Sequence, residues 1–188
     1  MEETDEILYE KYLKSDDQSA FAVVYDHHHE SLTFFLYTMV GNMEDAEELM
    51  LDAFAVAASK TAKFTGRGGA AFKTWLYGIA KNKAKMHLRR KKAITVPLSE
   101  EIITEEGLPE EKTIEKERDK KLYQSLSDIH KDYREALYLM YFEQMSIDEI
   151  ATVMKKSKKQ IYNLVARGKQ ALKEALERKG IYELYYDF

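Results

Sequence analysis

The stretch "SIDEIATVMKKSKKQIYNLVARGKQALKEAL" (residues 146–176) contains two helix-start signals. In each, a serine is followed three residues later by Glu or Gln: Ser146 with Glu149, and Ser157 with Gln160. The serine hydroxyl and the longer side chain satisfy free N–H groups at the start of a helix, an arrangement called a capping box. Only about two helical turns fit between the two signals. The sequence therefore predicts a short helix, a tight turn and a longer helix, which is a helix-turn-helix.

The second of these helices carries polar side chains of the kinds that contact DNA. Gln and Asn can pair with adenine edges, and Lys can pair with guanine edges or phosphates. The segment 151–179 has a net charge of +7, which favours DNA over an ordinary helical hairpin with a solvated face. The exposed first turns would offer Lys158, Lys159, Gln160, Tyr162 and Asn163, with Arg167 and Lys169 further along and suited to phosphates.

A second basic block lies nearer the N-terminus, around "FKTWLYGIAKNKAKMHLRRKK" (72–92). From Thr61 to Lys92 there are ten Lys and Arg and no Asp or Glu, although the net charge of the chain is −4. Soluble helices normally mix the two signs, so this block favours an anionic polymer as partner.

Helical spacing divides the same stretch into two edges. Phe72, Trp75, Leu76 and Ile79 follow the spacing of a buried stripe. A basic stripe can follow a phosphate backbone, and an aromatic ring can stack on an unpaired base. Trp75 as plain core is the alternative to a DNA contact. The second edge consists of Lys73, Tyr77, Lys81, Lys85 and Arg89, with Asn82 beside them.

The chain as a whole predicts an all-α fold. Helical periodicity dominates, and the two prolines, Pro97 and Pro109, both lie in the middle. The segment 94–118 carries both prolines and eight acids against three bases, which indicates an acidic flexible linker. We expect helices near 4–14, 19–40, 43–64, 72–92, 115–127, 132–143, 147–154 and 158–178. The resulting organisation is a first helical domain (1–93), the linker (94–118), a helix-turn-helix domain (119–179) and an aromatic acidic tail (180–188).

Composition excludes several classes of function. There is no apolar run long enough to span a membrane, and there is no cysteine for a disulfide or thiolate site. Three consecutive histidines in "DHHHE" (26–30) point about 100° apart on a helix, so we interpret them as a solvated face and expect no metal. No catalytic or cofactor fingerprint is present, so we expect a cytoplasmic protein that is not an enzyme and has no cofactor.

Four stretches in this order resemble the extracytoplasmic-function (ECF) sigma factors of bacterial RNA polymerase. They are "DAEELMLDAF" (45–54), "RGGAAFKTWLYGIAKNKAKMHLRRKK" (67–92), "YREALYLMYFEQMSIDEIATVM" (133–154) and "KKQIYNLVARGKQAL" (158–172). The resemblance implies a promoter-specificity subunit that binds core RNA polymerase and promoter DNA, with an anti-sigma factor as a usual inhibitory partner in the family.

The resemblance also implies roles for individual residues. The surface that would grip the clamp helices of the largest polymerase subunit falls on Asp45, Glu47, Glu48, Asp52 and Phe54. Contacts to the −10 element fall on Trp75, Lys81, Asn82, Lys85, Arg89 and Arg90. Contacts to the −35 element in the major groove fall on Lys158, Lys159, Tyr162, Asn163 and Arg167.

The sequence departs from the family pattern at a few positions: Leu51, Gly69, Met86 and Lys155 stand where Gln, an acid, Asp and Gly are frequent. Two further interpretations stay open at this point. A helix-turn-helix regulator that is not a polymerase subunit would explain 146–172 but not 45–54 or 67–92. A non-DNA-binding adaptor protein would use its basic face to meet an acidic protein.

Overall fold

A computed structural model describes residues 3–59, 64, 66, 71–94 and 124–181. The elements formed within these residues are helices, and no strand occurs among them, which confirms the all-α prediction. The predicted linker and tail lie outside the described residues, except for residues 94, 180 and 181. The helices of the first domain are α1 (Asp5–Ser15), α2 (Gln18–Val40), α3 (Met43–Ala58) and α4 (Phe72–Ile94).

Local chemistry fixes the boundaries of these helices. Asp17 caps α2, because its carboxylate accepts from the backbone N–H groups of Ser19 and Ala20. Gly41 ends α2 in a left-handed conformation with φ 74°, which glycine adopts without steric cost. Asn42 then caps α3 by accepting from the N–H of Asp45 at 2.8 Å. A long helix, a two-residue turn and the next helix therefore follow directly from "VGNMED".

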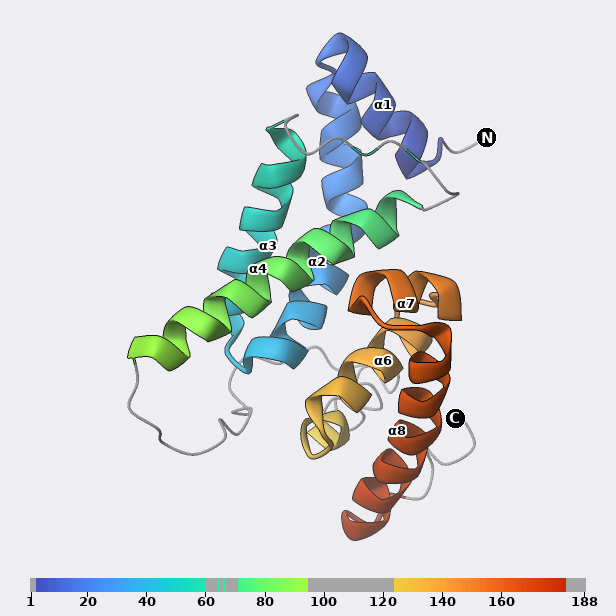
Figure 1. The fold of residues 1–188 in the computed structure, drawn as a ribbon. Coiled ribbons are helices and arrows are strands. Elements are labelled where there is room, and N and C mark those ends of the chain that lie inside the picture. The colour runs from blue at the N-terminus through green and yellow to red at the C-terminus, as the bar shows by residue number, and fades with distance from the viewer. Residues whose placement is uncertain (1–2, 60–63, 65, 67–70, 95–123, 182–188) are drawn as a thin grey trace.

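The core of the first domain is rich in aromatic rings. Phe35 and Phe72 are fully buried, and Tyr9 on α1 lies 4.8 Å from the Phe72 ring, measured between centroids. Two tyrosine hydroxyls of α1 donate to carbonyls at the end of α3: Tyr9 to Ala57 at 3.0 Å and Tyr12 to Ala58 at 2.8 Å. These bonds hold α1 across the α2–α3–α4 bundle (Figure 1).

The second domain contains α6 (Lys131–Tyr141), α7 (Ile147–Met154) and α8 (Lys158–Arg178), preceded by a helical turn at 124–127. The observed bounds of α7 are those predicted from the capping boxes, and those of α8 agree equally well. Helix α8 packs on α6 at Gly168, where a side-chain carbon would lie 3.2 Å from atoms of Leu137 and Tyr133. A glycine at this point lets the two helices approach closely.

The two domains pack against each other. Helix α7 lies along α4, and α6 lies against α2, so the second domain covers one face of the first (Figure 1). In the part of the chain that the structure describes, no helix is long and apolar enough to cross a bilayer.

Candidate nucleic-acid interface

Two capping boxes begin α7 and α8, as predicted. Ser146 accepts from the N–H of Glu149 at 3.4 Å, and the Glu149 carboxylate accepts from the N–H of Ser146 at 2.9 Å. Ser157 and Gln160 repeat this at the start of α8, with distances of 3.3 and 2.8 Å. Lys155 ends α7 in a left-handed conformation, φ 54°. The turn is thus made in spite of a lysine at a position that favours glycine.

The outer face of α8 is polar, exposed and basic. Its inner side chains Ile161 and Val165 are buried with Ile150 of α7, which fixes the orientation of the helix. Tyr162 is 61% exposed, an unusual position for a large aromatic side chain without a partner surface. The predicted contact residues all lie on the exposed side: Lys158, Lys159, Tyr162, Asn163 and Arg167.

Two polar side chains of this face already have intramolecular partners. Lys158 donates to Asp148 on α7 at 2.7 Å, and this hydrogen bond raises the pKa of the lysine. Gln160 is held by its capping box, in which its amide oxygen accepts from the backbone N–H of Ser157. Asn163 is therefore the better of the two amide side chains for reading a base edge.

The C-terminal half of α4 presents the basic face that the sequence predicts. Lys85, Arg89 and Arg90 are exposed. Among the described residues, none of these three forms an ion pair, so their charges face solvent. This part of α4 can follow a phosphate backbone.

The middle of the predicted basic edge is buried, so the prediction of one continuous exposed stripe is wrong. Tyr77 has no exposed surface and packs on Phe35 of α2, and Lys81 is 3% exposed because the second domain covers it. Lys81 forms an ion pair with Glu135 of α6. Burial, and then the neighbouring Lys85, lower the pKa of Lys81 to about 7. Asn82 is exposed, and its side-chain oxygen accepts from Lys155, at the C-terminal end of α7, at 3.0 Å.

Trp75 is half-buried in the aromatic core of the first domain. Its ring centroid lies 5.4 Å from that of Phe72, 5.5 Å from Tyr9 and 5.8 Å from Phe64. Most of the ring is therefore core, and a DNA contact by its exposed part stays a prediction.

The carboxylates predicted to face polymerase lie on α3, and two of them are tied to α4. Asp52 is 3.1 Å from the ammonium of Lys83, and Asp45 is 3.7 Å from that of Lys91. Phe54 is 4% exposed, so this side chain can only support the surface from beneath. The carboxylate positions are Asp45, which is half-buried, and Glu47, Glu48 and Asp52, which are exposed.

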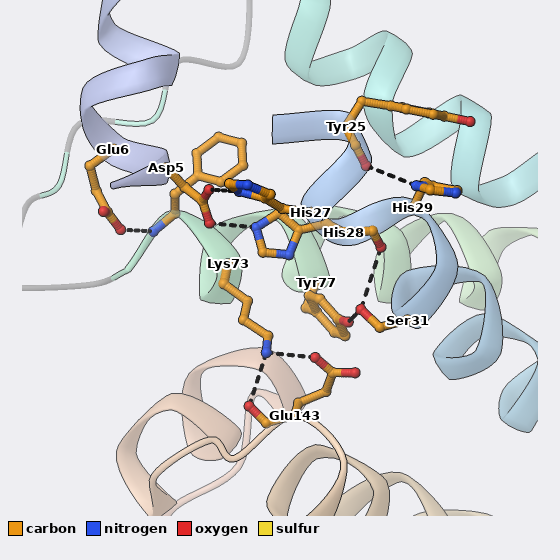
Figure 2. A network of polar contacts seen from close by, with 11 residues as sticks. Asp5, Glu6, Tyr25, His27, His28, His29, Ser31, Lys73, Tyr77 and Glu143 are labelled. Atoms are coloured by element: carbon orange, nitrogen blue, oxygen red, sulfur yellow. Dashed lines mark hydrogen bonds and ion pairs between the residues drawn. The ribbon is translucent and has the colours of Figure 1, made fainter. Parts of the chain in front are cut away.

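The histidine run is a structural contact, and its interpretation as a solvated face is wrong for His28. That side chain is 6% exposed, and its Nε2 lies 2.6 Å from Asp5, whose other oxygen is 2.7 Å from Nδ1 of His27 (Figure 2). The hydrogen bonds to His28 and His27 lower the pKa of Asp5 to about 2, against the opposing effect of burial. Among the described residues, no group of three or more potential ligands could hold a metal ion.

The residues of the second domain that join it to the first were not singled out from the sequence. Figure 2 shows Lys73 of α4 reaching Glu143, with 2.6 Å between the ammonium and the carboxylate and 2.9 Å to the Glu143 carbonyl oxygen. Arg134 donates to the carbonyl of Thr38 at 2.8 Å. The sequence carried one signal of this contact, the opposite net charges of 61–92 and 120–150, but net charge does not identify which residues pair.

Comparisons with known proteins agree with this layout. The family model described as Sigma-70 region 2 matches residues 24–94, and the model described as Sigma-70, region 4 matches residues 119–172. The chain is 28% identical to ECF RNA polymerase sigma factor SigW of Bacillus subtilis (strain 168), over 88% of this chain and 94% of that protein. It is 29% identical to RNA polymerase sigma-H factor of Pseudomonas aeruginosa, over 94% of this chain and 95% of that protein.

Solved structures share the fold. The structure of CnrH in complex with the cytosolic domain of CnrY matches with a TM-score of 0.68 at 20% identity, covering 94% of this chain and 99% of that chain. The sigma factor RpoE in complex with the anti-sigma factor NepR from Bartonella quintana matches with a TM-score of 0.66 at 20% identity, covering 84% and 96%.

An all-helical chain whose region 2 domain precedes a region 4 helix-turn-helix domain defines the class of bacterial promoter-specificity subunits. Within that class, the chain belongs to the ECF sigma factors of bacterial RNA polymerase. Its function is to direct transcription initiation as a subunit of that polymerase.

Proposed function

We propose that the first domain binds core polymerase and the −10 element, and that the helix-turn-helix domain binds the −35 element. One observation carries the proposal: α8 follows two formed capping boxes and presents an unbroken exposed polar face. The chain acts by positioning polymerase on DNA, in the cytoplasm, without catalysis or a cofactor of its own. Promoter DNA and the largest subunit of core polymerase are its partners.

In the −35 complex, the first turns of α8 enter the major groove. Asn163 reads a base edge, because it is exposed and Gln160 is occupied by its capping box. Lys158, Lys159 and Arg167 hold phosphates, and Tyr162 packs against the groove wall.

In the −10 complex, the exposed end of α4 follows the backbone of the separated strand. Lys85, Arg89 and Arg90 supply this contact, and Asn82 contacts a captured base. Lys81 joins them only after the second domain has moved off α4, because its ammonium is buried against Glu135 in this structure. Trp75 contributes through the exposed part of its ring.

The acidic face of α3 meets the clamp helices of polymerase. Glu47, Glu48 and Asp52 are exposed there, Asp45 lies at the edge, and Phe54 supports them from the core. An anti-sigma factor is a further partner. The sigma factor RpoE of Bartonella quintana was solved with the anti-sigma factor NepR, and we extend that kind of partner to this chain.

Run-off transcription tests the proposal. Core polymerase is supplied with or without this chain on a pool of promoter fragments, and core binding is measured in parallel. The expected result is a promoter-dependent transcript only in the presence of the chain. A chain that binds duplex DNA but neither binds core nor yields a transcript would instead be a regulator outside the polymerase.

The two DNA sites are separated by variants on one promoter. Arg89→Glu should weaken strand opening, measured by permanganate reactivity of unpaired thymines, while leaving binding of a −35 duplex in place. Arg178→Glu on the exposed end of α8 makes the same charge change away from both surfaces and serves as the control. Loss of duplex binding in Arg89→Glu would contradict the assignment of that residue to the −10 site.

A further inference from the structure

Helix α4 begins without a capping side chain or an acidic residue of its own. Ala71 stands at the N-cap position, because its carbonyl accepts from the N–H of Trp75 at 3.2 Å, and a methyl group cannot accept a hydrogen bond. The first turn of α4 contains no Asp or Glu, although the start of a helix favours negative charge. The acceptor comes instead from α1, 66 residues away in sequence. The carboxylate of Glu6 accepts from the backbone N–H of Phe72 at 2.9 Å (Figure 2).

Glu6 is held at this place by its neighbour in α1. Asp5 lies 2.6 Å from Nε2 of His28 and 2.7 Å from Nδ1 of His27, so the start of α1 is anchored on α2. Burial raises the pKa of Glu6, but the hydrogen bond from Phe72 and neighbouring contacts outweigh it and bring the pKa below its ordinary value. The group is therefore an anion at neutral pH, and its bond to the N–H is a charge-assisted one, which is stronger than a neutral hydrogen bond.

The same helix also holds the end of α3. The hydroxyls of Tyr9 and Tyr12 donate to the carbonyls of Ala57 and Ala58, at 3.0 and 2.8 Å. The connection from α3 to α4 therefore leaves from one contact with α1 and arrives at another. Helix α1 thus fixes the end of α3 and the start of α4 relative to each other.

The contacts of α1 reach the one aromatic side chain assigned to the −10 site. The ring of Tyr9 is 1% exposed and lies 4.8 Å from that of Phe72 and 5.5 Å from that of Trp75, measured between centroids. Trp75 stands in the first turn of α4, directly after the N–H that Glu6 accepts from. The family model of region 2 matches residues 24–94, so it does not include α1.

We propose that Glu6 is a positioning residue of the −10 site: by tying the start of α4 to α1, it sets the place at which Trp75 meets the separated strand. The inference rests on the proposed −10 function of α4. Glu6 itself touches no DNA in this arrangement. Its loss leaves the −35 surface of α8 and the acidic face of α3 as they are, and affects the opening of the promoter.

The first test examines the contact itself, without DNA. Amide hydrogen exchange of Phe72 is measured by NMR on the full chain, for Glu6→Ala and for the control Glu10→Ala. Glu10 is an exposed acid of the same helix whose partner is Lys14, so the control removes the same charge from α1. Loss of a charged hydrogen bond shifts an equilibrium about tenfold or more, so exchange at Phe72 should become about tenfold faster in Glu6→Ala only. Unchanged exchange at Phe72 in Glu6→Ala would overturn the proposal.

The second test separates positioning from general loss of structure. Each variant is combined with core polymerase on a promoter that the wild-type chain opens, and the permanganate reactivity of unpaired thymines is measured. Glu6→Ala should lower opening about five- to tenfold, with binding of core and of a −35 duplex unchanged, and Glu10→Ala should change none of the three. A parallel loss of all three activities, or normal opening, would overturn the positioning role while the proposed function stands. If the wild-type chain opens no promoter, the proposed function falls and this inference falls with it.

A rescue variant distinguishes positioning from simple capping. Ala71→Asp places a carboxylate at the N-cap, where it can accept from N–H groups of the first turn of α4 without any link to α1. E6A/A71D should therefore regain the stability lost in E6A, measured by urea unfolding, and should still open the promoter five- to tenfold less than wild type. Full recovery of opening in E6A/A71D would show that Glu6 acts only as a cap, and would overturn the proposal.

Discussion

Gly168→Ala should destabilise the second domain, although alanine is the better helix former. A Cβ at this position would lie 3.2 Å from Tyr133 Cβ, 3.2 Å from Leu137 Cγ and 3.3 Å from Leu137 Cδ1. The Tyr133 atom is attached directly to the α6 backbone, so rotation of a side chain cannot relieve that contact. Overpacking of this kind costs about 2–3 kcal/mol. The gain in helix propensity is about 1 kcal/mol, which leaves a net loss of about 1–2 kcal/mol.

Gly78→Ala is the matched control for this variant. Gly78 lies in the interior of α4, and no atom would come within 4 Å of an added Cβ. The propensity gain should therefore remain, as a stabilisation of about 0.5–1 kcal/mol. Urea unfolding followed by circular dichroism measures both variants. Fluorescence of Trp75, the single tryptophan, reports the first domain alone. Equal stabilisation by both alanines would refute the close α6–α8 approach.

Three further predictions concern single side chains. Asp148→Asn should release Lys158 and tighten binding of duplex DNA about two- to fivefold in fluorescence anisotropy, since an exposed ion pair is weak and its loss costs little. Asn163→Ala should change the preference among −35 sequences by about 1–3 kcal/mol in competitive run-off assays, and equal losses on every sequence would make it a backbone contact. Asp5→Asn should destabilise the chain by about 1 kcal/mol above pH 4, after allowance for partial exposure. Because the folded pKa of Asp5, about 2, lies below its ordinary value, this difference between wild type and variant should vanish as the pH falls from 4 towards 2. Urea unfolding of both chains at a series of pH values between 2 and 7, followed by circular dichroism, would measure this difference in stability.

Local patterns predicted the helices well because local chemistry determines where they begin and end. The capping boxes of Ser146 and Ser157 gave α7 its observed bounds and α8 its start, and Gly41–Asn42 marked the boundary between α2 and α3. These signals act within four residues of themselves. These signals therefore set the helix ends regardless of how the rest of the chain packs.

The histidine run makes a tertiary contact that local sequence patterns could not predict. Helix geometry argues against three adjacent histidines meeting one ion, but it cannot show that Asp5, 22 and 23 residues away, contacts two of them. The contact exists because Tyr9 and Tyr12 fix α1 across the bundle. Only the tertiary packing of α1 buries His28 on this otherwise exposed face.

The ion pairs of the basic block 61–92 were likewise beyond what the local sequence could predict. Its lack of acids favoured an anionic polymer as partner, yet the acids for Lys83 and Lys91 come from α3, and those for Lys73 and Lys81 come from the second domain. The α3 pairs lie within one domain, so these two lysines stabilise the α3–α4 contact. The pairs made by Glu135 and Glu143 join the two domains. The same block of charge therefore holds two contacts at once, one between α3 and α4 and one between the first domain and the second.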